Sequence, residues 1–390
     1  MYTFYEFFAG GGMARAGLGE KWECLFSNDI DKKKAETYKA HWGSEDFYTG
    51  DVRNIKTINL PGIADLVWGS FPCQDLSLAG AGKGLNSKRS GSFWPFWRLV
   101  QDLNKEERGP KLIVLENVCG ALSSNSGKDF TSIAEAFTKE GYHFGAIIAD
   151  AAHFLPQSRP RLFIIGVRAD VTIPNYMVSA QPTQNWHSKK LIERVSEFPF
   201  ALAKKWVWWN LPAPPERQEN LIDFIELSFS SIPWNTDEQT EYILSLMSNR
   251  HLNKIKLAID KRKTIVGGLY KRMRHGIQRA EVRFDGLAGC LRPPTGGSSR
   301  QTIILIQNGK VKSRLLSPKE GAALMGLPSD YILPSNYTDS YKLLGDGVAV
   351  PVVEFLTKNI LAPLLEENVS LLKPPIRDYK YRERYKKHAT

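Results

Sequence analysis

The chain has 390 residues, of which 42% are hydrophobic and 24% charged, and its formal net charge at pH 7 is +11. This composition excludes a largely disordered chain, and we find no apolar run of the length that a membrane span requires. The positive charge favours a polyanionic partner, because each neutralised phosphate releases condensed counterions, although charge alone does not identify one.

Up to about residue 168, short β-rich runs alternate with stretches of helix-compatible composition. Strands are predicted over residues 3–8, 23–28, 64–70, 111–116, 144–149 and 161–168. Crossover helices are predicted over residues 32–41, 93–106 and 128–140. Such alternation is typical of a mainly parallel, doubly wound sheet, so the predicted fold class is α/β with a Rossmann-like domain.

Beyond residue 170 the regular alternation gives way to proline-rich, tryptophan-rich and basic sequence. For Trp206, Trp208 and Trp209, core packing is favoured over base stacking. The run over 261–274 contains no acidic residue, and we interpret it either as a phosphate-binding surface or as a charged face exposed to solvent. We therefore expect four parts, namely a catalytic domain over 1–170, a second domain over 171–340, a helix over 341–363 that returns to the first domain, and a basic tail over 364–390.

A glycine-rich turn, Phe8-Ala-Gly-Gly-Gly12, ends the first predicted strand, and Asp29 ends the second, nineteen residues after Gly10. Glycines let a backbone approach a ligand closely, and an acid at this place can hold ribose hydroxyls, which favours a nucleotide-like cofactor. The glycine spacing is not that of a dinucleotide fingerprint, and such a turn also serves plain strand-to-helix packing. Asp51 is interpreted either as a contact to adenine or as a turn cap, and the two interpretations have equal weight.

The four cysteines, Cys24, Cys73, Cys119 and Cys290, are too dispersed for a metal site or a disulfide framework, so we expect no metal. A single cysteine is usually a small buried hydrophobe. Cys73 differs, because Phe71-Pro-Cys-Gln74 follows the fourth predicted strand at the edge where α/β sheets bind ligands, and a stretch of small residues suited to a lid comes next.

Charged residues are predicted at the same edge. Glu116 ends the fifth strand, where it is a helix cap or the acid that accompanies a nucleophile. Arg159 and Arg161 open the last strand, where they are surface charges or contacts to an anionic or electron-rich ligand.

Taken in order, these motifs resemble the bacterial cytosine-5 DNA methyltransferases over residues 4–168 and 314–360. The matching segments are Phe8-Ala-Gly-Gly-Gly12, Phe71-Pro-Cys-Gln74, Glu116-Asn-Val118, Gln157-Ser-Arg-Pro-Arg161, Ser317-Pro-Lys-Glu320 with Leu324-Met-Gly326, and Gly345-Asp-Gly-Val348. The resemblance implies a Rossmann-like methyltransferase domain that uses S-adenosylmethionine, followed by a smaller target-recognition domain.

Two residues depart from the family pattern. Glu6 stands where the family has aspartate, which keeps the charge, and Asp346 stands where the family has asparagine. If Asp346 faces the methionine carboxylate of the cofactor, the two like charges repel, and changing it to asparagine tightens cofactor binding. The alternative is that Asp346 turns away to a basic neighbour and leaves only the backbone of Gly347 near the cofactor.

The resemblance also implies roles for single residues. Cys73 attacks C6 of cytosine, a protonated Glu116 contacts N3 and the exocyclic amine, Arg161 holds the base carbonyl, and Arg159 positions Glu116 or the backbone. The implied cofactor-binding residues are Phe8, Gly10, Gly12, Asp29, Ile30, Asp51, Val52, Pro72, Gly347 and Val348. No metal is required.

The implied partner is double-stranded DNA from which the target cytosine is flipped out, because its atoms are inaccessible inside a duplex. The candidate DNA contacts are Gln74, Ser77, Arg89, Lys261, Arg262, Lys263, Arg292, Thr295 and Arg300. We expect a monomer that is located in the cytoplasm and associated with the nucleoid. Whether it has a companion restriction or defence protein is left open. The alternatives are a tRNA cytosine-5 methyltransferase, a DNA-binding module with a weak active site and, more remotely, a nicotinamide oxidoreductase.

Overall fold

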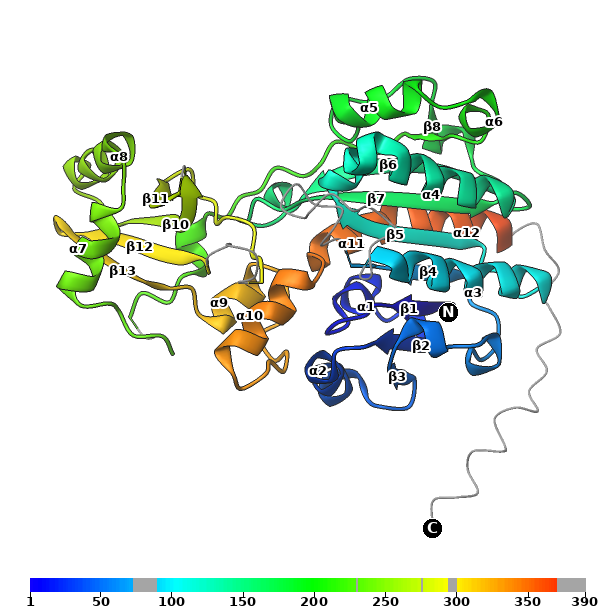
Figure 1. The fold of residues 1–390 in the computed structure, drawn as a ribbon, viewed down its shortest axis with the longest axis horizontal. Helices are drawn as coiled ribbons and strands as arrows, with labels where there is room; N and C mark the ends of the chain where they lie inside the picture. Colours follow the sequence, from blue (N-terminus) through cyan, green and yellow to red (C-terminus); the bar gives the residue numbers. More distant parts are fainter. Residues whose placement is uncertain (73–89, 229–230, 275, 294–299, 370–390) are drawn as a thin grey trace, which may run out of the picture.

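The computed structural model describes residues 1–72, 90–228, 231–274, 276–293 and 300–369. Figure 1 shows a large lobe built on one twisted sheet and a small lobe built on a second sheet. The large sheet has seven strands in the order β3-β2-β1-β4-β5-β7-β6. Their bounds are β1 Tyr2–Phe7, β2 Trp22–Asp29, β3 Phe47–Thr49, β4 Leu66–Gly69, β5 Leu112–Val118, β6 Tyr142–Asp150 and β7 Pro160–Arg168.

The strands of the large sheet are parallel except β7, which pairs antiparallel with both β5 and β6. The run from Leu112 to Leu115 in β5 is buried on both faces, as expected of a central strand covered by helices on each side. The predicted α/β fold class is therefore confirmed. The reversal of β7 matters for function, because it brings the start of that strand to the edge where its parallel neighbours end.

Helices cover both faces of the large sheet (Figure 1). Two long helices, α3 (Phe93–Lys105) and α4 (Lys128–Lys139), pack on one face. The other face carries α1 (Met13–Leu18), α11 (Val350–Leu356), a π-helical turn over Thr357–Leu361, and α12 (Ala362–Val369). The helix α2 (Lys32–Trp42) follows β2 and packs beside β3.

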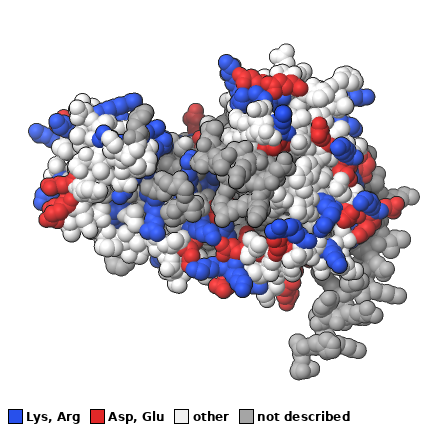
Figure 2. Space-filling model, in the orientation of Figure 1, with Lys and Arg blue, Asp and Glu red and all other residues white. Residues whose placement is uncertain are grey.

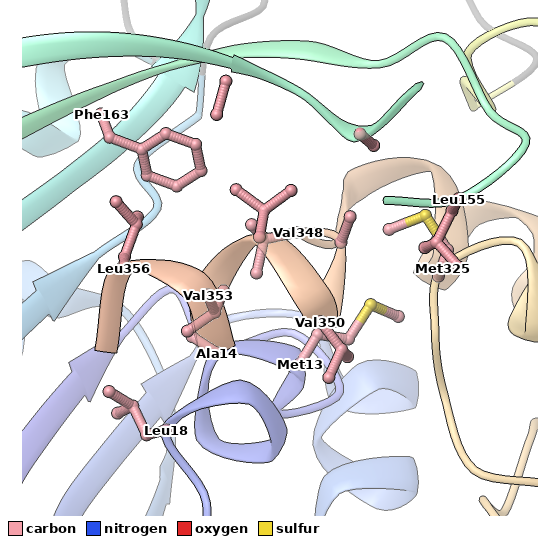
Figure 3. Packing of buried hydrophobic residues seen from close by; sticks show 14 of the residues in the cluster. Met13, Ala14, Leu18, Leu155, Phe163, Met325, Val348, Val350, Val353 and Leu356 are labelled. Carbon is pink, nitrogen blue, oxygen red and sulfur yellow. The ribbon is translucent and has the colours of Figure 1, made fainter. Parts of the chain in front are cut away.

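The C-terminal helices complete the core, as Figure 3 shows for the packing of Val353 and Leu356 near Ala14. The approach of α11 to α1 is so close that a Cβ at Gly17 would lie 2.4 Å from the Cβ of Val353. By length and composition, Tyr337–Glu366 is apolar enough to cross a membrane, which corrects the expectation from the sequence. In the structure most of this run is buried against the sheet, and Gly347 interrupts it, so it forms core helices.

The first test of this packing is the substitution Leu356→Ala. Leu356 is fully buried, so the change leaves a cavity and should lower the free energy of unfolding by about 2–5 kcal/mol. The matched control is Leu257→Ala on α8 (Asn249–Asp260), where the leucine is 64% exposed and the expected change is within about 0.5 kcal/mol. Urea denaturation measures both, and equal effects would contradict the packing described above.

Residues just beyond 170 pack on the large lobe. The segment contains β8 (Val178–Ser179), α5 (Lys189–Ser196), α6 (Phe200–Ala203) and β9 (Trp208–Trp209). Its backbone bonds to β6, with the Val207 amide 2.8 Å from the Phe144 carbonyl oxygen. Trp209 is fully buried and Trp206 and Trp208 pack against the core, which confirms the expected core packing. The boundary at residue 170 stays a prediction, and the packing does not change there.

The small lobe is an antiparallel sheet in the order β11-β10-β12-β13. Its strands are β10 Ile265–Arg274, β11 Ile277–Arg283, β12 Thr302–Gln307 and β13 Lys310–Leu315, and it packs against α7 (Asp237–Ser245) and α8. The chain then returns through α9 (Pro318–Ala323) and α10 (Tyr337–Asp346), whose C-terminal end reaches the large lobe. This return brings the segment between β11 and β12 to the edge of the large sheet.

Candidate active site at the sheet edge

Those predicted catalytic and cofactor-binding residues that the structure describes lie around the edge where β1, β2, β4 and β5 end. Because β7 runs in the opposite direction, its first residues lie at the same edge, and Arg161 pairs in register with Val118. Glu116, Arg159 and Arg161 are therefore neighbours, although the arginines follow the acid by more than forty residues in sequence. The antiparallel strand thus assembles the charged part of the site.

The glycine turn after β1 is held by Asp29. Its carboxylate accepts hydrogen bonds from the Gly10 amide at 2.8 Å and from the Asp31 amide at 2.8 Å. Gly10 and Gly12 have positive φ angles of 57° and 78°, a conformation that favours glycine. A Cβ at Gly12 would lie 2.4 Å from Trp42, whereas one at Gly10 would meet nothing within 4 Å. The turn is therefore closely packed on one side and open beside Gly10.

Further residues beside this opening suit an adenosine group. Ile30 leaves 64% of its surface exposed next to Asp29, which offers an apolar face beside a carboxylate. The side chain of Asn28 donates to the carbonyl oxygen of Gly50 at 2.8 Å and so fixes the approach to Asp51. The open glycine turn, the apolar side chain and the carboxylate together fit S-adenosylmethionine.

Asp51 serves as a turn cap. Its carboxylate accepts from the Arg53 amide at 2.9 Å and pairs with the Arg53 guanidinium at 2.6 Å. The hydrogen bond from Arg53 lowers the pKa of this carboxyl below its usual value, although partial burial opposes the shift. Of the two interpretations of Asp51, capping is the one that the structure shows, while a contact to adenine stays a prediction. Val52, the next residue, is buried.

The departure at Glu6 changes more than the length of a side chain. Glu6 is fully buried in β1, and burial raises the pKa of its carboxyl to about 8 despite the nearby Arg15. One carboxyl oxygen accepts no hydrogen bond from any group that the structure describes. Burial therefore favours the neutral form of the Glu6 carboxyl, and the expectation that Glu6 keeps the charge of the usual aspartate stays a prediction.

The loop that leads to Cys73 is anchored at its base. The Asn117 side chain donates to the Phe71 carbonyl oxygen at 3.3 Å, and the Phe71 ring packs on Phe93 with the ring centroids 5.3 Å apart. Pro72 follows and is exposed at the edge. The expected site residues Cys73, Gln74, Ser77, Arg89 and Thr295 lie outside the described residues. Asn117, for which sequence reasoning gave no role, therefore fixes the entry to the expected nucleophile.

Glu116 has the properties of a proton-holding acid. It is 6% exposed, and its Oε1 lies 3.1 Å from Nε of Arg161. Burial raises the pKa of its carboxyl, while Arg161 and Arg159 oppose that rise without cancelling it. A carboxyl whose pKa is raised keeps its proton to higher pH and can donate it to a ring nitrogen.

Arg159 holds backbone groups rather than Glu116. It is 1% exposed and donates to the carbonyl oxygens of Leu291 at 3.0 Å, of Gly345 at 2.9 Å and of Gly347. The family resemblance left a choice between positioning Glu116 and positioning the backbone, and these contacts place Arg159 with the backbone. The guanidinium thus ties the loop after α10 to the segment that returns from the small lobe.

Asp346 pairs with a basic neighbour. Its Oδ2 lies 2.6 Å from Nζ of Lys34 on α2. Two further ion pairs at 2.5 Å join the same helices, Lys33 to Asp339 and Lys342 to Asp31. This ion pair favours the alternative in which Asp346 pairs with a basic neighbour, while its effect on cofactor binding stays a prediction. Nothing in the sequence pattern marks Lys34 as its partner.

This ion pair makes Asp346→Asn a direct test. Once its partner is neutral, Lys34 is left beside Asp29 and Asp31, and its attraction to Asp29 disturbs the carboxylate that holds the glycine turn. We expect S-adenosylmethionine to bind about fivefold more weakly, which is about 1 kcal/mol for a partly exposed pair. The double variant Lys34→Met with Asp346→Asn should recover most of that loss. Calorimetric titration decides, and tighter binding by Asp346→Asn alone would revive the repulsion.

Residues to which the sequence analysis assigned no individual role also join the two lobes. Gln157 is fully buried and donates to the Leu324 carbonyl oxygen at 2.7 Å. Arg314 and Glu320 form a buried ion pair at 2.5 Å, and Glu320 also completes the helix cap begun by Ser317. The motif Ser317-Pro-Lys-Glu320 therefore has a structural role in connecting the two lobes, which its capping pattern could have indicated.

The expected DNA contacts are dispersed. Lys261, Arg262 and Lys263 are exposed at the turn between α8 and β10, and Arg292 is exposed near the sheet edge. Arg300 is turned onto α10, where it donates to Thr338 at 2.9 Å. Figure 2 shows Lys and Arg spread over the small lobe and along the boundary between the lobes. A basic surface therefore borders the site, and it includes residues that the sequence analysis did not select as DNA contacts.

Comparisons with known proteins agree with this geometry. The chain is 27% identical over 369 residues to the type II methyltransferase M1.ScrFI of Lactococcus lactis subsp. cremoris, covering 93% of this chain and 79% of that protein. It is 26% identical over 359 residues to M.HhaI of Haemophilus parahaemolyticus, covering 92% and 93%.

Among solved structures, Dnmt2 of S. pombe has a similar fold, with a TM-score of 0.57 at 17% identity over 94% of this chain and 99% of that one. The methyltransferase EhMeth of Entamoeba histolytica gives a TM-score of 0.59 at 16% identity, covering 95% and 99%. The model of the family described as C-5 cytosine-specific DNA methylase matches residues 2–362. Because that match spans nearly the whole chain, the protein belongs to the C-5 cytosine-specific DNA methylase family.

Proposed function

We propose that this chain transfers a methyl group from S-adenosylmethionine to C5 of a cytosine flipped out of a specific duplex DNA sequence, through a covalent bond from Cys73 to C6. The observation that carries the proposal is the buried Glu116–Arg161 pair at the edge where the loop to Cys73 begins. Family membership supports the reaction type, and this pair supplies the acid that the reaction needs.

The side chains divide the work at the base. The Cys73 thiolate adds to C6 of the ring, which opens the C5–C6 double bond and makes C5 electron-rich, while the proton held by Glu116 is shared with N3, so that negative charge does not build up on the ring. After C5 has taken the methyl group, it loses its proton to a base and the bond from C6 to Cys73 breaks, which restores the double bond and frees the thiolate. Arg161, beside Glu116, would donate to the carbonyl oxygen of the base. Arg159 keeps Gly345 and Gly347 in position behind this pair.

The cofactor would lie along the open side of the glycine turn. Gly10 offers backbone without a side chain, Asp29 is placed for the ribose, and Ile30 for one face of the adenine. When bound, S-adenosylmethionine supplies the methyl group as an electrophile. Phe8, Gly12, Val52, Pro72, Gly347 and Val348 are the further residues that we assign to this site.

Duplex DNA would lie between the lobes. Leu269 of β10 pairs with Thr302, and the neighbouring Gln301 bonds to Tyr341 of α10, so this end of the small sheet faces the large lobe. Beyond Leu269, the hairpin of β10 and β11 carries Arg272 and Arg274, both exposed. Their ion pairs with Glu281 at the surface are weak and leave them able to bind phosphate. Lys261 to Lys263 lie at the opposite end of β10.

Salt dependence separates these two basic groups. We expect Arg272→Ala with Arg274→Ala to lower the slope of log affinity against log salt by about 1.8, because each lost phosphate contact removes about 0.9. The triple alanine variant of Lys261, Arg262 and Lys263 is the control and should leave the slope unchanged. The reverse pattern would show that DNA lies over the turn at 261–263, as the sequence alone suggested.

The proposal is tested by methyl transfer from radiolabelled S-adenosylmethionine to duplex DNA and to tRNA. Incorporation into DNA alone supports it, and incorporation into tRNA alone would reassign the substrate. Duplex DNA with 5-fluorocytosine at the target position adds a test of the covalent step, because fluorine cannot leave as a proton does. A complex that survives denaturation is expected, and its absence with a verified target would contradict the Cys73 bond.

A further inference from the structure

Cys290 lies beside the charged part of the active site. It belongs to the segment between β11 and β12, which Arg159 holds against the large lobe. Its Sγ lies 3.4 Å from Nη1 of Arg159 and 3.9 Å from both Nη1 and Nη2 of Arg161. Arg161 therefore stands between two groups that can carry negative charge, since its Nε faces Glu116 and its Nη atoms face the sulfur.

We propose that Cys290 is a positioning residue for methyl transfer, whose thiolate binds Arg161 and offsets the positive charge that the arginines place beside Glu116. The inference rests on the proposed function, in which Glu116 must hold a proton. Both arginines favour the charged form of Glu116 and so work against that proton. A thiolate on their other side counteracts part of this effect.

The surroundings of Cys290 support a thiolate. Burial by itself would raise the pKa of the thiol, but Arg159, Arg161 and Arg292 together outweigh it and hold the pKa at about 7. From α10, the other element near the sulfur, Tyr341 faces it as a neutral phenol, because burial raises the pKa of Tyr341. The three arginines thus favour the thiolate form of Cys290 near neutral pH.

The groups that face Glu116 give the sign of the effect. Besides the two arginines, these are Ser70 after β4, which donates a hydrogen bond, and Cys119 after β5. Burial raises the pKa of Cys119, so it is a neutral thiol at pH 8. Among the groups that the structure describes near Glu116, Cys290 is therefore the one whose ionisation adds negative charge as the pH rises, and it keeps the pKa of Glu116 higher than the arginines alone would leave it.

Two substitutions separate charge from shape. Cys290→Ser keeps the size of the side chain and removes the charge, whereas Cys290→Asp keeps a negative charge and alters the shape. Single-turnover methylation of duplex DNA should fall at alkaline pH as Glu116 loses its proton. In Cys290→Ser we expect that fall to move to lower pH by about one unit, with rates like the wild type below about pH 6.5. Cys290→Asp should keep the wild-type profile.

If Cys290 had a purely structural role, the two variants would behave in the opposite way. The serine variant would then have rates near those of the wild type, and the aspartate variant would be impaired at every pH. An unchanged alkaline limb in Cys290→Ser would overturn the inference, whatever the aspartate variant does. Cys24→Ser, at a buried position in β2, is the control for loss of a thiol and should keep the wild-type profile.

Alkylation adds a readout that does not depend on turnover. The rate of Cys290 modification by iodoacetamide, followed by mass spectrometry, should rise with a midpoint near pH 7, and a midpoint above about 9 would overturn the proposal. Failure of the proposed function is distinguishable, because wild-type protein would then methylate no cytosine in DNA. Failure of this inference alone leaves wild-type methylation intact and the serine profile unshifted.

Discussion

Replacing Cys73 with alanine is expected to lower the rate of methyl transfer by about 10³-fold or more. Without the thiolate, C5 of cytosine is not activated, because the bond at C6 that makes it electron-rich cannot form. Affinity for S-adenosylmethionine and for DNA should stay within about threefold of wild type. This follows because the cofactor residues and the basic surfaces are carried by other elements.

Single-turnover kinetics with saturating DNA measure the effect, and filter binding checks that the variant still binds DNA. Cys24→Ala is the matched control, because Cys24 is a buried cysteine in β2 and not at the sheet edge. Residual turnover of the Cys73 variant within about tenfold of wild type would mean that another group, or no covalent bond, serves the reaction.

Replacing Glu116 with alanine is expected to lower the same rate by about 10²–10⁴-fold, the usual contribution of a positioned acid. Glu116→Gln should retain more activity, because its amide can donate to N3 as the protonated carboxyl does. The pH dependence distinguishes the two roles of the carboxyl. Burial raises the pKa of Glu116, so the protonated, active form prevails at low pH and is lost as the pH rises through that raised pKa.

The glutamine side chain does not titrate, so its alkaline limb should be absent, while the acid limb that reports ionisation of Cys73 remains. Rate profiles between about pH 6 and 9 for the wild type and Glu116→Gln provide the comparison. An alkaline limb of equal position in both proteins would show that a different group controls it, and Glu116 would then lose its assignment as the acid.

The sequence predicted the large sheet well, because its central strands are short runs rich in apolar residues between helical stretches. It also predicted that Glu116 and Arg161 share an edge, since Glu116 lies near the end of β5 and Arg161 near the start of β7, while Cys73 lies outside the described residues. What fixes their final geometry is the reversal of β7, which sets Arg161 opposite Val118.

Contacts between distant segments could not be predicted. Lys34 and Asp346 are separated by 312 residues, and Arg161 and Cys290 by 129, without any local pattern that pairs them. The packing of residues 178–209 on β6 was missed for a related reason. An edge strand must be covered, but which strand lies at the edge becomes known only with the order of the sheet.

Bisulfite sequencing of DNA from cells that express this chain tests cytosine-5 methylation of DNA most directly. Bisulfite converts unmodified cytosine and spares 5-methylcytosine, so methylated positions are identified together with their flanking sequence. We expect protected cytosines at one recurring sequence in cells with the wild-type chain and none there in cells with Cys73→Ala. Complete conversion at all sites, or equal protection in both strains, would contradict the assignment.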